Sequence, residues 1–504
     1  MTVKVGSFQV TAAVIGTQIP VTGIGFLPDA VFFRWTGRNS AVDAGPSRHA
    51  LMEGFGYILN NGERGCMSSY AQDNADPCAT GSGLWNSYAI VRQTAAGATV
   101  GRADFHSMNA DGFTVIIDEQ FGAEITVSYT AIFGKRFKVI ELTEPAAIGV
   151  QAYTGASFIP AFAMFLTANV AAYDTMATDT RWGMGAASGT GADSNFTWSL
   201  FEDSGAGIAT TKAYCRRTEC LSLTTSGSVD MRAKLNGFTA DGFELDWLER
   251  AGVRKVLAVV SDGRWYVGND VTSVALGVPW SLSGFTWSPE GYMMISRNGP
   301  ENAVDTFAGT PQHESGFSVG FATGPAERNV LHTRRNFDGN AGASREVSMH
   351  EFDEVYGNVD DAAAPAVLGL ADISAAFGID DIELTMDDAD PAAKFFGYIA
   401  IGPPVTEFRE SLVEYQHNSY QSRAAGRPIF RQRGGREVRL EQIQTDNWVF
   451  SGGAGFPSPT KYENLLEDPN VFYIESLGVS EGQAEIQTDR EGFFESIMKR
   501  LGRG

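Results

Sequence analysis

One serine in the sequence stands in a pattern used for nucleophilic catalysis. Gly316-Phe-Ser318-Val-Gly320 matches Gly-x-Ser-x-Gly, which in α/β-hydrolases forms a sharp turn between a strand and a helix and exposes the serine hydroxyl. Here glycines alternate with bulky residues, which is typical of a β-strand, and a similar Gly-Phe strand begins near Gly54. We therefore expect Ser318 to be a strand residue and not a nucleophile.

Metal-ligating residues are present but lack the spacing of common metal sites. Four cysteines form two close pairs, Cys66 with Cys78 and Cys215 with Cys220, which leaves buried thiols, local disulfides or a metal site as readings. Acidic runs such as Asp387-Asp-Ala-Asp390 lack EF-hand spacing, so we expect solvated loops there. No His-x-x-x-His or His-x-His pair occurs among His49, His106, His313, His332, His350 and His417. The sequence therefore predicts no metal and no cofactor.

Aromatic rings and paired carboxylates are what a carbohydrate site would need. Rings in loops can stack on sugars, although such rings more often pack on the body of the domain. Glycoside hydrolysis uses two carboxylates that flank the scissile bond, but no pair stands out among the 60 acidic residues. We predict that the protein is not an enzyme, and the candidate glycan contacts are Trp85, Trp182, Trp265 and Tyr266.

Charge is distributed unevenly along the 504 residues. The net charge of −22 argues against nucleic acid as a partner, because phosphate binding needs positive charge. Residues 403–504 carry 12 Lys/Arg against 15 Asp/Glu, whereas residues 1–402 carry 26 against 45. Arginine favours bidentate pairing with carboxylates, so we expect the basic run to dock an acidic protein surface through Arg423, Arg427, Arg431, Arg433, Arg436 and Arg439.

The elements that would position these residues are set by a repeated motif. Glycines followed by aromatic-x-Pro and an apolar run occur at Gly23–Phe33, again at Gly155–Phe165, and more faintly at Trp287–Ile295. The three prolines, Pro28, Pro160 and Pro289, are 132 and 129 residues apart. Proline fits the first residue of a strand because it cannot donate a ladder hydrogen bond. A repeat of this length indicates one small domain per copy.

A second motif closes the repeats. Ala103–Val115 and Ala233–Leu245 share the pattern Ala-x-apolar-x-x-apolar-x-Ala-Asp-Gly-Phe-x-apolar at an offset of 130 residues. Asp-Gly between alternating apolar runs predicts a hairpin. In the third copy Ile382–Met386 takes this place, and an Ala/Asp-rich insertion, Val359–Ala376, is expected to include a short helix.

Together these patterns predict an all-β protein of three tandem antiparallel β-sandwich domains plus an extended C-terminal arm with little regular structure. The expected boundaries are 1–134, 135–263, 264–402 and, for the docking or anchoring arm, 403–504. The uncharged stretch 146–173 contains proline, glycines and polar residues, so we expect a strand there and no membrane insertion. Because Met1-Thr-Val-Lys-Val lacks a charged segment followed by an apolar core, we expect no signal peptide there.

An aromatic-x-Pro strand at the front, a late Gly-Phe strand and a closing strand such as Tyr129-Thr-Ala131-Ile-Phe-Gly134 together resemble the small β-sandwich modules of tailed-bacteriophage virion proteins, and more faintly H-type lectin domains. The resemblance covers residues 1–402. It implies a structural tail-fibre, tail-tip or head-decoration protein in the virion, assembled in the host cytoplasm. Its implied partners are other virion proteins, further copies in a homotrimer or higher symmetric oligomer, and host surface glycans. The alternative functions are a carbohydrate-binding adhesin and, less well supported, a glycan-degrading spike enzyme.

Overall fold

The computed structural model describes residues 2–404, except 41, 76–77, 95–97, 206–210, 227, 298–313, 337–344 and 361–363. Beyond 404 it describes only 414–415, 429–431, 437–439, 477–480 and 483–485. In this part of the chain the protein is all-β, as predicted, and its one helix is the single 3₁₀ turn η1 (Ala192–Ser194). Residues Met1–Pro404 form one compact unit, and Val405–Gly504 form another.

The first sandwich is built from an inner and an outer antiparallel sheet. In spatial order the inner sheet contains β1 (Val3–Val10), β11 (Ile125–Ile132), β3 (Ala30–Trp35), β5 (Gly54–Leu59), β6 (Arg64–Ala71) and β7 (Thr80–Trp85). The outer sheet contains β2 (Gln18–Thr22), β10 (Gly112–Glu119), β9 (Thr99–Asn109) and β8 (Ile90–Gln93).

The second and third sandwiches repeat this order strand for strand. The second has an inner sheet of β12 (Phe137–Thr143), β22 (Lys255–Ser261), β14 (Phe162–Ala168), β16 (Thr180–Ala187), β17 (Asn195–Glu202) and β18 (Thr211–Arg216), and an outer sheet of β13 (Gly149–Thr154), β21 (Gly242–Glu249), β20 (Val229–Thr239) and β19 (Leu221–Thr224). The third has β23 (Trp265–Val271), β32 (Phe395–Ile401), β25 (Gly291–Arg297), β26 (Glu314–Gly324), β27 (Glu327–Asn336) and β28 (Arg345–Glu351), with β24 (Trp280–Ser283), β31 (Asp381–Asp388), β30 (Val367–Ile373) and β29 (Tyr356–Val359) outside.

The strand after each aromatic-x-Pro motif is buried on both faces, which explains its continuous apolar run. Side chains alternate between the two faces of a strand. In β3 one face, with Val31, Phe33 and Trp35, packs inside the first sandwich. The other face, with Ala30 and Phe32, joins a central core. The equivalent strands β14 and β25 divide their side chains between a sandwich core and the central core in the same way.

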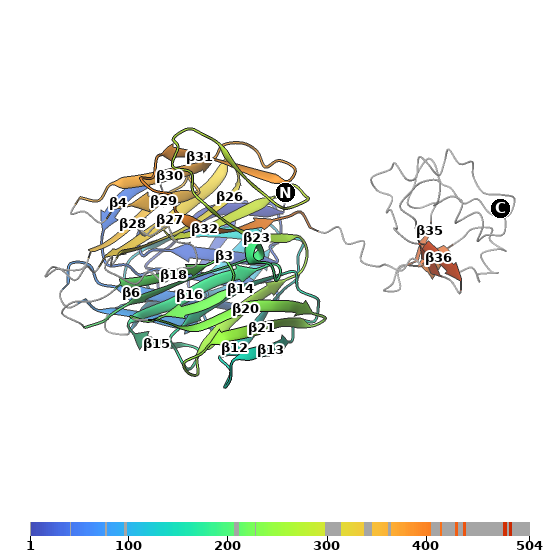
Figure 1. Ribbon diagram of the computed structural model, residues 1–504, viewed down its shortest axis with the longest axis horizontal. Coiled ribbons are helices and arrows are strands. Elements are labelled where there is room, and N and C mark those ends of the chain that lie inside the picture. The colour runs from blue at the N-terminus through green and yellow to red at the C-terminus, as the bar shows by residue number, and fades with distance from the viewer. Residues whose placement is uncertain are drawn as a thin grey trace. The chain divides into compact units, whose positions relative to one another are not determined.

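This central core joins the three sandwiches into one body. It contains Phe32, Phe55 and other residues of the first inner sheet, Met164 and Trp198 of the second, and Phe317 of the third. Two strands also cross between sandwiches: β15 (Thr175–Thr178) extends the first inner sheet beside β7, and β4 (Ala44–Arg48) extends the third beside β28 (Figure 1). The three repeats are therefore interlocked as well as tandem.

The hairpin and the entry loop that the sequence singled out are in direct contact. Ala110 and Asp111 form the hairpin turn, and Gly112 begins β10 at a φ of +153°. A Cβ atom at Gly112 would lie 2.0 Å from the carbonyl oxygen of Val21 in β2, so only glycine fits this approach. Gly242 has the same relationship to the carbonyl oxygen of Tyr153.

The short helix expected within Val359–Ala376 is wrong for the described residues of that stretch, which contain strand β30; Gly369, Ala371 and Ile373 are buried in alternation, so period-two packing prevails over alanine's helix preference. In the C-terminal unit the described residues are β33 (Glu414–Tyr415), β34 (Ile429–Arg431), β35 (Glu437–Arg439), β36 (Leu477–Ser480) and β37 (Gln483–Glu485), in two small antiparallel sheets.

Candidate functional site

The serine of the Gly-x-Ser-x-Gly pattern is a strand residue, as expected. Ser318 lies in β26, is 1% exposed, and pairs across the ladder with His332 of β27. Burial lowers the pKa of His332 well below its ordinary value. Because no sharp turn presents Ser318 to solvent, this pair lacks the exposed geometry of a nucleophile and its base.

Three of the four aromatic residues proposed for glycan contact are packed inside the body. Trp182 packs against Trp198 and, edge to face, against Phe317 in the central core. Trp265 lies nearly parallel to Phe162, with ring centroids 4.2 Å apart. Trp85 is also buried and donates a hydrogen bond to Ser68 Oγ at 2.8 Å. A buried indole has no free face for a sugar ring, so of this group only the half-buried Tyr266 can reach a ligand.

The proposed docking arginines fall in the C-terminal unit. Arg431 ends β34 and Arg439 ends β35. The other four, Arg423, Arg427, Arg433 and Arg436, lie outside the described residues. Docking through this run stays a prediction.

The four cysteines all lie in the described part of the chain, where they are buried and form no disulfide. Cys66 and Cys220 face the cores of the first and second sandwiches. Burial raises the pKa of the Cys66 thiol well above its ordinary value. Cys215 joins the central core, and Cys78 lies between β6 and β7.

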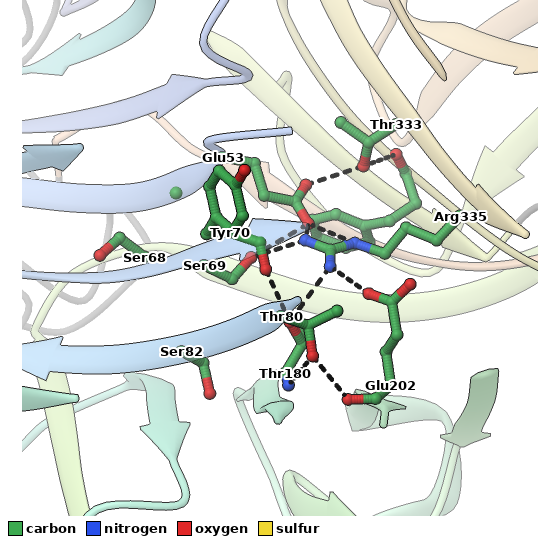
Figure 2. Close-up of polar contacts among 12 residues, drawn as sticks. Glu53, Ser68, Ser69, Tyr70, Thr80, Ser82, Thr180, Glu202, Thr333 and Arg335 are labelled. Atoms are coloured by element: carbon green, nitrogen blue, oxygen red, sulfur yellow. Dashed lines mark hydrogen bonds and ion pairs between the residues drawn. The ribbon is translucent and has the colours of Figure 1, made fainter. Parts of the chain in front are cut away.

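The most unusual polar feature is a charged cluster buried where the three sandwiches meet, which we call the ionic centre: Arg34, Glu53, Glu202, Arg335 and Glu346. Each of the five side chains is at most 1% exposed. Arg34 Nη2 donates to Glu53 Oε2 at 2.6 Å, and Arg335 Nη2 donates to Glu53 Oε1 at 2.5 Å. Arg335 Nη1 donates to Glu202 Oε2 at 2.6 Å (Figure 2). The ionic centre therefore links residues of all three repeats through one guanidinium.

Neutral hydroxyls complete the bonding around Arg335 and Glu53. Thr333 donates to Glu53 Oε2 at 2.8 Å, and Arg335 Nη2 also donates to Ser69 Oγ at 2.7 Å (Figure 2). Burial alone would raise the pKa of Glu53, but the charges of Arg335 and Arg34 and the hydrogen bonds outweigh it and lower the pKa to about 2. Glu53 is therefore ionised at neutral pH.

Sequence reasoning missed the ionic centre, although part of its signal is visible. Arg34 is the one charged residue in the apolar strand Ala30–Trp35. Arg335 is the last residue of the stretch Asn-Val-Leu-His-Thr-Arg-Arg at 329–335. A charge inside a buried strand requires a partner. The partners are up to 282 residues away, as for Glu53 and Arg335, and no spacing rule connects such positions.

Hollows occur beside the ionic centre and on the surface near β4. The void beside Arg34 and Glu53 is small and closed by Phe55, Trp182 and Phe317. A second, open depression is lined by residues of the first repeat, including Arg38 and His49. There Arg38 Nη1 donates to the carbonyl oxygens of Ala44 and Gly45 in β4 and of Ser348 in β28, and so links these two strands.

No protein-family model matches this chain, and neither does any curated protein sequence. Among the described residues there is no helix with the length and apolar character needed to cross a membrane. The stretch 146–173 instead contains β13 and β14.

Proposed function

We propose that this protein is a structural component of a tailed-phage particle, acting through assembly and host-surface attachment and not through catalysis. The observation that carries the proposal is the fusion of three sandwiches through one central core, cross-braced by β4 and β15. Such a body is a rigid building block. Its most unusual polar residues are enclosed, which favours a mechanical role over substrate binding.

Exposed aliphatic side chains on equivalent loops add support for docking. The loop between the first two strands of each repeat exposes Val14 and Ile15 in the first, Ile148 in the second and Leu276 in the third. Ile15, Ile148 and Leu276 are 67%, 63% and 62% exposed. Large apolar side chains repeated at equivalent exposed positions favour contact with other proteins, here other virion proteins or further copies in a symmetric oligomer.

Labelling of purified particles tests the proposal. Gold-labelled antibody against residues 1–404 should decorate one fixed position on particles produced by the phage whose genome carries this gene. Chain that is absent from purified particles and present only in the lysate would overturn the proposal.

A loop variant then tests the docking surface. Ile15→Asp, Ile148→Asp and Leu276→Asp combined should leave the melting temperature nearly unchanged, since the side chains are exposed, but should reduce incorporation into particles at least tenfold. Thr190→Asp, in another exposed turn, is the matched control and should be incorporated normally.

A further inference from the structure

One edge of the ionic centre brings together three groups that can ligate a metal ion. Cys78 Sγ and one carboxylate oxygen each of Glu202 and Glu346 lie within 4.8 Å of one another. Cys78 belongs to the first repeat, Glu202 to the end of β17 in the second, and Glu346 to β28 in the third. All three side chains are fully buried.

The two carboxyl groups of this trio have unused bonding capacity. Both oxygens of Glu346 and Oε1 of Glu202 are buried without a hydrogen-bond partner among the described residues. One carboxylate oxygen of Glu346 lies within 4.8 Å of a carboxylate oxygen of Glu202, and two carboxylates can hydrogen-bond to each other only if one is protonated. Buried carboxylates without donors are costly unless they are paired or bind a metal.

The charge balance of the ionic centre also allows a bound divalent cation. Glu53, Glu202 and Glu346 provide three negative charges, and Arg34 and Arg335 provide two positive ones. One proton on Glu346 would neutralise the cluster. A divalent cation does so as well when Cys78 binds as thiolate and Glu346 as carboxylate, and two protons are then released to solvent.

We propose that Cys78, Glu202 and Glu346 form a structural zinc site, with one ligand from each repeat. Zn²⁺ accepts thiolate and carboxylate ligands in tetrahedral sites, with bond lengths of about 2.3 Å to sulfur and 2.0–2.2 Å to oxygen. Those lengths place donor atoms roughly 3.5 Å apart, so small side-chain rotations close the present arrangement around an ion. A thiolate ligand selects against Mg²⁺ and Ca²⁺, because these ions prefer oxygen ligands. These three protein ligands leave the fourth tetrahedral position to a water molecule.

The metal content of the full-length chain tests the site. Because the site is enclosed, the ion must enter during folding. Chain expressed in zinc-supplemented medium, or unfolded in guanidinium and refolded with ZnCl₂, should retain about one equivalent of zinc after dialysis against EDTA. Refolding with CoCl₂ should give the visible bands of tetrahedral Co²⁺ together with a thiolate-to-cobalt charge-transfer band.

Three variants distinguish this site from other sources of metal or stability. Cys78→Ser and Glu346→Gln should each lower retained zinc at least fivefold and abolish the charge-transfer band. Cys220→Ser, which changes a buried thiol in the core of the second sandwich, should retain both.

Two results would overturn the proposal. The first is metal-free wild-type chain after both routes, with a melting temperature that does not depend on zinc; a shared proton would then account for the Glu202–Glu346 contact. The second is full zinc retention by Cys78→Ser and Glu346→Gln, which would place the ion elsewhere.

Discussion

The carboxylate of Asp111 accepts a hydrogen bond from the backbone N–H of Gly25 at 2.6 Å, so the hairpin turn of the first repeat holds the loop that leads into β3. Gly23 N–H donates to the other carboxylate oxygen at 3.0 Å. In the second repeat Asp241 accepts from Gly155 and Ser157 at the same positions. The entry loop and the closing hairpin are therefore one structural unit, which accounts for their common spacing.

Replacing Asp111 by alanine should lower the free energy of unfolding by about 1 kcal/mol, because two charge-assisted hydrogen bonds at an exposed site are lost. Chemical denaturation monitored by tryptophan fluorescence measures this. Asp118→Ala, an exposed aspartate of the same hairpin, should change the free energy of unfolding by less than about 0.5 kcal/mol. Equal losses for the two variants would contradict a special role for Asp111.

Gly112→Ala should be more damaging than Asp111→Ala. The added Cβ meets the carbonyl oxygen of Val21 at 2.0 Å, and the φ of +153° is unfavourable for alanine. Overpacking of this kind costs about 1–3 kcal/mol or more, measured as a shift in the denaturation midpoint. Gly122→Ala, where a Cβ meets nothing within 4 Å, should be nearly neutral, and a comparable loss there would argue against the clash.

Arg335→Met should be among the most destabilising single changes in the body. The substitution removes the ion pairs of Arg335 with Glu53 and with Glu202, and Glu53 keeps only Arg34 as a charged partner. Removing one partner of a buried ion pair costs about 3–5 kcal/mol. The double variant Arg335→Met with Glu202→Gln should recover part of that loss, since it removes one uncompensated carboxylate. Additive losses in the double-mutant cycle would show that the two residues are not coupled.

The free energy of unfolding should fall as pH rises from about 5 to 9, and Glu354 should cause part of this fall. Burial, together with the charges of Asp387, Asp372 and Asp353, raises the pKa of Glu354 from 4.5 to about 9, while Arg328 is paired with Asp372 nearby. Between these two pKa values the folded chain holds a proton that the unfolded chain releases. The stability that this proton contributes is therefore fully present below the pKa of Glu354 in the unfolded chain. It is lost as pH rises through the pKa of Glu354 in the folded chain.

Glu354→Gln should accordingly unfold at a higher temperature than wild type at pH 8, and the difference should shrink toward pH 5. Thermal unfolding across this range measures it. Asp388→Asn, at an exposed position of β31, should leave the wild-type slope unchanged. If Glu354→Gln keeps the wild-type slope, the pH dependence belongs to other groups. Glu351 is the first of these to test, because burial and the charges of Asp43 and Asp353 raise its pKa to about 7.

The sequence was sufficient to predict the sandwiches but not to predict how they pack against one another. Proline before β3 and β14, the Asp-Gly pair before β10 and β21, and period-two alternation are local signals, and they predicted strands that the structure contains. The contact of Arg34 with Glu53 and of both with the third repeat depends on three sheets meeting, which no local pattern encodes. Trp182 and Trp265 show the same limit, because in isolated sandwiches their strands would have a solvent-facing side, whereas here that side is the central core.

The crossing of β4 into the third inner sheet has a consequence for biosynthesis. Arg48 and Ser47 pair with Val347 and Ser348, so β4 leaves the ribosome roughly 300 residues before its partner strand. At about 5–20 residues per second it waits for tens of seconds. During that interval β4 and the first repeat's share of the central core lack their partners from the third repeat.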